Sequence, residues 1–177
     1  MNSTTLRDPT AETTSVVRAR HAPPASLDGQ TIGLVDIGKM RGDEFIDRLE
    51  QLFVAGGRKV RRYRKPTNTR TAPVEMLQAI AAECDIVVIA LSDCGSCTSC
   101  STHDLNDLDQ RGIPGVSVLT SEFRDAFAKQ CGAIGFGGAS VYVPHPMQNR
   151  TTGELHGLAD DCFAEILARI AAPGAQS

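Results

Sequence analysis

Residues 86–91 constrain the fold of this chain more than any other segment, because they read Ile-Val-Val-Ile-Ala-Leu without interruption. A run of this length is too short to cross a membrane as a helix, and its β-branched residues favour a strand. A strand that is apolar on both faces is typical of the centre of a parallel sheet, where helices cover both sides. We therefore expect an α/β fold built around residues 86–91.

Strands and helices alternate along the rest of the chain. Apolar or alternating segments predict further strands at residues 32–37, 60–63, 116–119 and 141–143. Helical periodicity and capping residues predict five helices, one ending at Gly56, one spanning about 98–110, and three beginning at Thr71, Ser121 and Thr151. This pattern predicts a three-layer α/β fold with a mostly parallel five-stranded sheet, for which a flavodoxin-like strand order is favoured.

The length of 177 residues suits one domain with a hydrophobic core. Residues 1–28 are rich in Thr, Ser, Pro and Arg and lack hydrophobic periodicity, so they are predicted to form an extended N-terminal arm. Residues 29–172 are predicted to form a single α/β domain, and residues 173–177 a flexible tail. Because the arm has little capacity to bury itself, we expect it to lie on a partner, in a homo-oligomer or a complex with a related subunit.

The composition argues against several classes of protein. The net charge is −3, Trp is absent and aromatic residues make up 5%, whereas nucleic-acid binding needs a basic surface and stacking rings. No signal peptide or membrane helix is evident, so we expect a cytoplasmic protein that binds neither nucleic acid nor membrane. Six cysteines in a reducing compartment are not expected to form a static disulfide framework, so clustered ones are candidates for catalysis, redox cycling or metal binding.

Three evenly spaced cysteines, Cys94, Cys97 and Cys100, follow the central predicted strand directly. In one interpretation Cys94 is a nucleophile in the strand-to-helix turn, where backbone N–H groups and the helix dipole stabilise a thiolate. Cys97 would then resolve an oxidised or mixed-disulfide form of Cys94. Ser96 is expected to supply a capping oxygen to the turn.

A metal site is the second interpretation, because the series continues to His103 at the same spacing. Zinc or iron would be the ion, held by Cys94, Cys97 and Cys100. On a continuous helix, however, nine residues rotate through about 900°, which places Cys94 and His103 on opposite sides. No resident cofactor is therefore expected, with a metal ion kept as the alternative. A third interpretation has all three thiols packed inertly.

Further candidate residues follow from the fold, because the loops at the carboxyl ends of parallel strands share one edge of the sheet. His103 and the adjacent Asp104 are candidates for proton transfer, although an exposed helical histidine explains the same pattern. The candidates for substrate binding at this edge are Asp36, Lys39, Thr98, Thr120 and His145.

Several segments together carry a resemblance to a known family. They are Cys94-Gly95-Ser96-Cys97-Thr98-Ser99, His103-Asp104, Gly112-Ile113-Pro114, Val118-Leu119-Thr120 with Phe123, and Pro144-His145-Pro146. The chain resembles the UGSC family of selenoproteins and their cysteine homologues over nearly its whole length, and Cys94 occupies the selenocysteine position. The resemblance implies catalysis by Cys94 with Cys97 as its redox partner. More distantly, selenoproteins of the glycine reductase type carry a related element and cleave a carbon–heteroatom bond. Cys100 is a thiol that the motif does not require.

Three hypotheses about function follow. The favoured one is a thiol-dependent oxidoreductase that acts on a small electrophilic molecule, by thiol–disulfide chemistry or reductive cleavage of a carbon–heteroatom bond, and is regenerated by a thiol reductant. The second is a redox-neutral lyase or hydrolase that uses Cys94 with His103. The third is a metal-binding or non-catalytic subunit of a hetero-oligomer.

Overall fold

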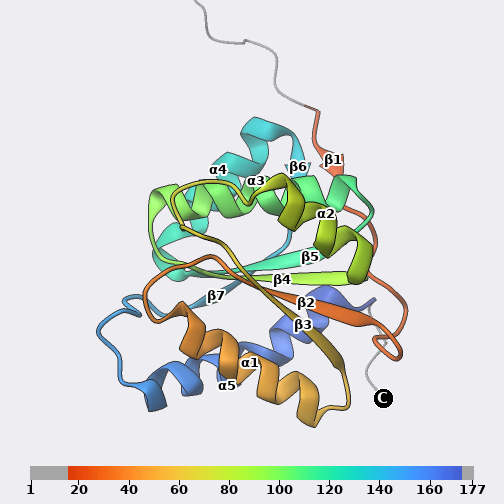
Figure 1. Cartoon of the computed structure of the whole chain (residues 1–177). Coiled ribbons are helices and arrows are strands. Elements are labelled where there is room, and N and C mark those ends of the chain that lie inside the picture. The colour runs from red at the N-terminus through yellow and green to blue at the C-terminus, as the bar shows by residue number, and fades with distance from the viewer. Residues whose placement is uncertain (1–15, 173–177) are drawn as a thin grey trace, which may run out of the picture.

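A five-stranded parallel sheet lies between two layers of helices in the computed structural model, which describes residues 16–172 (Figure 1). Across the sheet the strands run β3 (Lys59–Arg64), β2 (Thr31–Asp36), β4 (Ile86–Ser92), β5 (Gly115–Thr120) and β7 (Ser140–Val143). All four neighbouring pairs are parallel. This strand order is the flavodoxin-like order, so the predicted fold class is confirmed.

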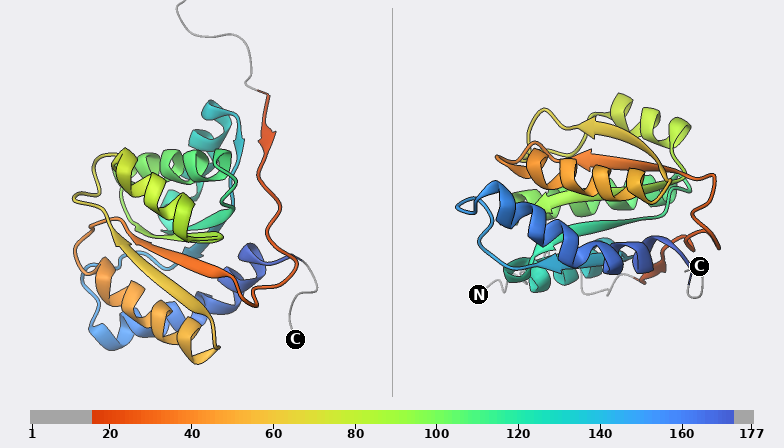
Figure 2. Two further views of the ribbon diagram at one scale, coloured as in Figure 1. Left: turned by 45° about the vertical axis from the view of Figure 1, so that its right-hand side comes forward. Right: turned by 90° about the horizontal axis from the view of Figure 1, so that it is seen from below.

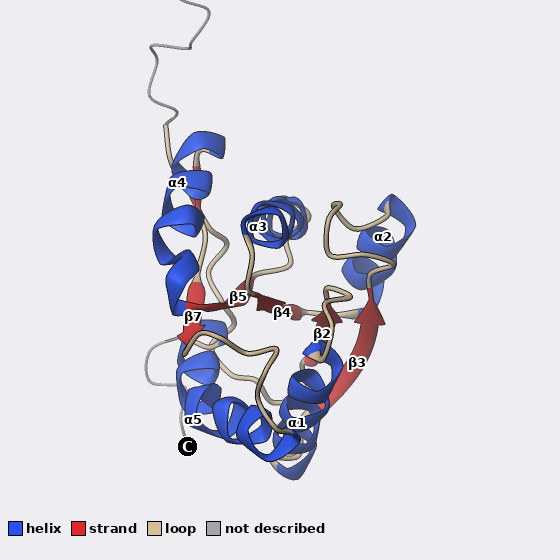
Figure 3. Ribbon diagram, turned by 90° about the vertical axis from the view of Figure 1, so that its left-hand side faces the viewer, coloured by secondary structure: helices blue, strands red, loops and turns tan. Residues whose placement is uncertain are grey.

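The helices are divided between the two faces of the sheet (Figure 3). One face is covered by α1 (Gly42–Ala55) and α5 (Thr152–Ile170), the other by α2 (Val74–Glu83), α3 (Gly95–Gln110) and α4 (Arg124–Ile134), which follows the short 3-10 turn η1 (Ser121–Phe123). Within residues 16–172, no helix is both long and apolar enough to cross a membrane.

Strand β4 is buried at all seven positions, as its sequence predicts. Because side chains alternate along a strand, Val88 and Ala90 pack into the core under α1 and α5, whereas Val87 and Ile89 pack into the core under α2, α3 and α4. Gly115 on β5 allows this close packing, since a Cβ atom there would lie 2.5 Å from the Val87 carbonyl oxygen. The centre of the sheet is therefore closely packed on both faces.

Three helices begin at residues other than those predicted. Helix α3 begins at Gly95, three residues early, because Cys94 caps it through sulfur. Helix α2 begins at Val74 and not after Thr71, because the Ala72 N–H donates to the Asp104 carboxylate instead of to a helix cap. The segment from Ser121 first forms the 3-10 turn, and α4 begins at Arg124.

The described part of the arm, residues 16–28, lies along the chain's own domain (Figure 2). There β1 (Arg18–Ala19) pairs in parallel with β6 (Phe136–Gly137), two short strands that the sequence did not predict. The Arg18 guanidinium donates to the buried Asp109 carboxylate at 2.5 Å. Residues 1–15 of the predicted arm and the predicted tail at 173–177 lie outside the described residues.

Candidate active site

The first turn of α3 is built around two sulfur atoms. Cys94 occupies the N-cap position in an extended conformation, and its Sγ accepts a hydrogen bond from the Cys97 N–H at 3.4 Å. In return the Cys97 Sγ accepts a hydrogen bond from the Cys94 N–H at 3.0 Å. This is a capping box in which cysteines replace the usual hydroxyl and carboxylate side chains. The C-x-x-C spacing therefore serves helix initiation as well as bringing two thiols together.

The two thiols differ in exposure although their Sγ atoms lie only 2.8 Å apart. Cys94 is partly exposed, whereas Cys97 is fully buried and donates to the Cys94 carbonyl oxygen at 3.1 Å. Ser96, which the sequence suggested as the cap, instead places its Oγ 3.5 Å from the Cys94 Sγ. A molecule arriving from solvent therefore meets Cys94 first.

The surroundings move the pKa values of the two thiols in opposite directions. Burial raises the pKa of Cys94, but hydrogen bonding with the Cys97 side chain, the Ser96 hydroxyl and the Cys97 N–H, together with the positive charge of Lys39, brings it below that of an ordinary thiol. Burial and the neighbouring Cys94 raise the pKa of Cys97 to about 11. Cys94 is thus the better thiolate of the pair, and Cys97 stays protonated at neutral pH.

An ion pair borders the thiols. The Lys39 Nζ lies 2.8 Å from one carboxylate oxygen of Asp93, and the Gln148 side-chain amide donates to the other at 3.1 Å. Burial lowers the pKa of Lys39, but Asp93 and the two neighbouring thiols together raise it by more, so the amine stays charged. On another side, the Asn68 amide nitrogen is 3.9 Å from the Cys94 Sγ. The positive charge of Lys39 is therefore held beside the reactive sulfur.

Three of these neighbours, Asn68, Asp93 and Gln148, were not among the residues predicted from the sequence. Each follows the carboxyl end of a strand, namely β3, β4 and β7. That position was the available signal, because such loops meet at one edge of the sheet. A search of every polar residue after each strand would have found them.

A cavity of about 270 Å³ adjoins this edge, lined by Asp93, His145, Pro146, Gln148 and Asn149. The His145 Nδ1 lies 3.0 Å from the hydroxyl of the buried Thr120. The Phe123 ring is 6.1 Å from the imidazole, measured between ring centroids. The cavity has room for roughly nine water molecules, and so for a small polar ligand.

The predicted substrate-binding residues fall into two groups. Lys39 lies near the thiols, and His145 lines the cavity. The other three are buried and bind the backbone or another side chain, namely Asp36, Thr98 and Thr120.

Asp36 and Thr98 hold backbone in place. Asp36 accepts from the Gly38 N–H at 2.8 Å and pairs with Arg64 at 3.3 Å. Gly38 itself has a φ of 78°, a conformation that favours glycine. Thr98 donates to the Cys94 carbonyl oxygen at 2.7 Å. Both therefore fix the two loops that frame the site without facing the cavity.

The structure does not bring His103 and Asp104 to the thiols. Asp104 is buried, with its carboxylate 2.6 Å from the Lys65 Nζ and 2.7 Å from the Ala72 nitrogen. His103 lies 3.1 Å from the Gln130 amide and lines a different cavity, of about 290 Å³. Nine residues of helix separate it from Cys94, a distance of about 14 Å along the axis. A direct Cys94–His103 mechanism lacks the necessary contact.

The residues that could hold a metal ion also differ from the predicted set of Cys94, Cys97 and Cys100. Among residues 16–172, the group whose ligand atoms lie within 4.8 Å of one another is Asp93, Cys94 and Cys97, without Cys100. Closed zinc sites take four ligands, and the Asp93 carboxylate is already paired with Lys39. These three residues fit a structural metal ion poorly.

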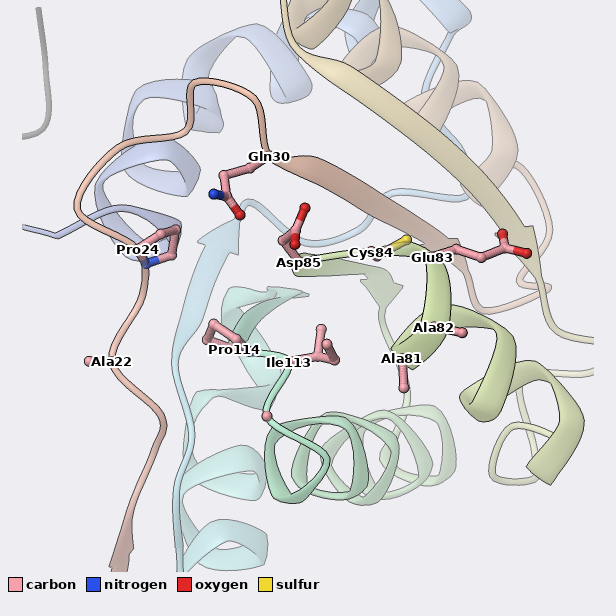
Figure 4. A pocket seen from close by; sticks show the side chains of 11 residues that line it. Ala22, Pro24, Gln30, Ala81, Ala82, Glu83, Cys84, Asp85, Ile113 and Pro114 are labelled. Carbon is pink, nitrogen blue, oxygen red and sulfur yellow. The ribbon is translucent and has the colours of Figure 1, made fainter.

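Another cavity lies away from the Cys94–Cys97 pair, at the amino ends of the strands (Figure 4). Its volume is about 450 Å³, and it is lined by Ala22 and Pro24 of the arm and by the loops before β2, β4 and β5. Cys84 is a lining residue, but burial raises its pKa and its Sγ lies 3.5 Å from the Tyr63 hydroxyl. Cys84 is therefore a poorer thiolate than Cys94.

Comparison with known proteins agrees with the motif at Cys94. The model of the UGSC family matches residues 5–172. The chain belongs to the UGSC family. The resemblance seen in the sequence is thereby confirmed, and within this family protein the C-G-S-C motif forms the first turn of α3 with its N-cap. No curated protein matches the chain.

Solved structures similar to this UGSC protein include flavodoxins. A diflavin flavoprotein A3 from Nostoc sp. is 13% identical with a TM-score of 0.44, covering 78% of this chain and 94% of its own. A C101S mutant of flavodoxin from Pseudomonas aeruginosa is 12% identical with a TM-score of 0.43, covering 78% and 99%. Likenesses this distant say nothing about ligand or activity.

Proposed function

We propose that this UGSC protein is a thiol-dependent reductase that transfers two electrons from Cys94 and Cys97 to a small electrophilic substrate. The main support is the unequal thiol pair: a partly exposed Cys94 with a lowered pKa lies 2.8 Å from a buried Cys97 whose pKa is raised. An attacking thiol needs thiolate character and access, whereas a resolving thiol needs only proximity.

With a disulfide as substrate, the atoms and electrons balance in two steps. The Cys94 thiolate attacks one sulfur, a Cys94 mixed disulfide forms, and the other half leaves as a thiol after taking up a proton. Cys97 then loses its proton and attacks the Cys94 sulfur, which releases the second thiol and leaves a Cys94–Cys97 disulfide. An external thiol reductant restores both cysteines.

The same pair supplies two electrons for reductive cleavage of a carbon–heteroatom bond. Cys94 displaces the heteroatom, which leaves with a proton, and a thioether forms at the substrate carbon. Cys97 attacks the Cys94 sulfur, the carbon leaves with a proton, and the disulfide forms. Because the electrons come from the thiols, neither version calls for a resident metal or cofactor.

The polar surroundings support a small substrate. The adjoining cavity holds about 270 Å³ and is lined by a carboxylate, an imidazole and two amides. Lys39 keeps a positive charge beside the sulfur, which favours the thiolate before attack. We propose that the substrate is a polar molecule of a few non-hydrogen atoms on the cavity side of Cys94.

The stoichiometry of thiol release tests this proposal. Reduced protein is mixed with hydroxyethyl disulfide, and released thiol is counted while intact mass is recorded. The wild type should release two thiols per chain and gain no mass adduct. C97S should release one and retain a mixed disulfide, and C94S should release none.

Two results would contradict the proposal. If C94S released thiol as the wild type does, Cys94 would not be the attacker. If C97S still released two thiols per chain, Cys97 would not resolve the adduct, and a redox-neutral role for Cys94 would be favoured instead.

A further inference from the structure

The cavity beside Cys94 contains one imidazole, and it is held in place from two sides. The His145 Nδ1 lies 3.0 Å from the Thr120 hydroxyl, and Phe123 contacts the ring at 6.1 Å between centroids. Pro144 and Pro146 flank the histidine in the chain and restrict its backbone. His145 is exposed, and its Nδ1 is the ring atom that these contacts fix.

The Thr120 contact determines which ring nitrogen is available. Thr120 is fully buried at the end of β5, so its hydroxyl position is fixed by the sheet. Because the Thr120 hydroxyl is within hydrogen-bond distance of Nδ1, Nε2 is the ring nitrogen left to meet a substrate. Within residues 16–172, the His145 ring makes its hydrogen bond at Nδ1, and none is present at Nε2.

His145 also shares its cavity with the residue next to the nucleophile. Asp93 lines the cavity together with His145, and an Asp93 carboxylate oxygen lies within 4.8 Å of the Cys94 Sγ. A substrate that reaches from the Cys94 sulfur past Asp93 into this cavity would therefore meet His145. His103, the histidine suggested by the sequence, lines a separate cavity.

We infer that His145 is the proton donor to the leaving group in the reaction of Cys94, and that Thr120 is its positioning residue. The inference rests on the proposed function and deepens it. When the Cys94 thiolate attacks a disulfide, the imidazolium Nε2–H gives its proton to the departing sulfur. The departing group leaves as a neutral thiol, and the neutral imidazole later regains a proton from water.

The test uses two disulfides whose leaving groups differ in their need for a proton. Hydroxyethyl disulfide releases an aliphatic thiolate, which leaves slowly unless it is protonated, whereas dithiobis(nitrobenzoate) releases a stable aromatic thiolate. H145Q should slow the first step with hydroxyethyl disulfide by at least about 10-fold, since general acids commonly contribute that much or more. Its rate with the aromatic disulfide should stay within about 2-fold of wild type.

H103Q is the matched control, because it makes the same change at the imidazole of the other cavity. It should leave both rates unchanged. T120V should reproduce the selective loss in weaker form, because it removes the Nδ1 contact and keeps the imidazole. T120V also provides an independent reading if H145Q folds poorly, which circular dichroism would show.

Equal losses with both disulfides in H145Q and in T120V would overturn the inference, since they would indicate a general disturbance of the site. No loss with either disulfide would overturn it as well. C94S separates this failure from failure of the proposed function: if C94S is inert while H145Q behaves as wild type, only the role of His145 is removed. If C94S reacts normally, the proposed function fails.

Discussion

The first and third turns of α3 both carry polar or ionisable side chains that suggested chemistry in the sequence, and they differ in physical character. In the first turn, Cys94 and Cys97 form a capping box in which Cys94 is partly exposed, and the preceding Asp93 lines a polar cavity. In the third turn, Asp104 forms an ion pair with Lys65, and both side chains are buried. Cys100 lies between them, and burial raises its pKa. We call the first turn, with Cys94 and Cys97, the reactive end of α3, and the third turn, with the Asp104–Lys65 ion pair, its structural middle.

The division follows from helix geometry. From Cys94 to Cys100 the helix turns through about 600°, so the two thiols face directions about 120° apart. The helix dipole and the unpaired N–H groups also act on the first turn alone. A thiolate is therefore stabilised at Cys94 and not at Cys100.

The largest expected effect comes from replacing Cys94 by serine, with the same replacement at Cys100 as the control. C94S should lower the rate of mixed-disulfide formation with hydroxyethyl disulfide by a factor on the order of 100 or more, because the most stable thiolate is lost. C100S should stay within about 2-fold of wild type. Stopped-flow measurement of thiol release checks both rates. A comparable loss of rate in C100S would show that Cys94 and Cys100 do not differ in reactivity.

The structural middle is tested by stability. K65M should lower the free energy of unfolding by about 3–5 kcal/mol, because it leaves the Asp104 carboxylate buried without its cation. Urea denaturation measures this value, and labelling of the folded variant should show the reactivity of Cys94 unchanged.

Its matched control is K39M, which removes the lysine of the other ion pair. Since Lys39 is 15% exposed at its side chain, solvent compensates part of the lost charge and the cost should be smaller. If K39M were the more destabilising variant, the assignment of Lys65 as the structural lysine would be incorrect.

K39M should have its main effect on the chemistry of the first turn. Lys39 lowers the pKa of Cys94, so its removal should raise that pKa and slow alkylation at pH 7 by about 3- to 10-fold. At a pH above the pKa of the variant, where Cys94 is fully ionised in both proteins, the two rates should converge. A deficit that persisted there would indicate altered access instead of altered ionisation.

The smallest expected effect concerns His103. Because H103Q acts on an exposed side chain about 14 Å along the helix from Cys94, the rate of Cys94 alkylation should change by less than about 2-fold. Alkylation of the variant beside wild type across neutral pH checks this. A large decrease would restore a Cys94–His103 mechanism.

The fold was predictable to the extent that hydrophobic pattern determines it. The apolar run of β4 and the helical periodicity around it indicated the layers and the strand order. The strands β1 and β6 were missed. Each has two residues, too few to show an alternating hydrophobic pattern, and the pairing joins Arg18 to a segment more than 100 positions away.

The site was predictable in its nucleophile and less so in its neighbours. Strand-to-helix spacing located Cys94 and Cys97, but sulfur as a helix cap was not anticipated, so α3 was expected to begin too late. Asp104 follows His103 directly, which suggested a catalytic pair, whereas its partner Lys65 lies 39 positions away. Long-range ion pairs of this kind leave no local pattern.

Whether the first turn of α3 makes Cys94 the reactive thiolate can be measured through the pH dependence of alkylation. Reduced protein is treated with iodoacetamide from acid to alkaline pH, and each cysteine is quantified by peptide mass spectrometry. The midpoint for Cys94 should lie below that of an ordinary thiol, and Cys97 should stay unmodified until its pKa of about 11 is approached. A midpoint for Cys94 at or above the ordinary value, or earlier labelling of Cys100, would contradict it.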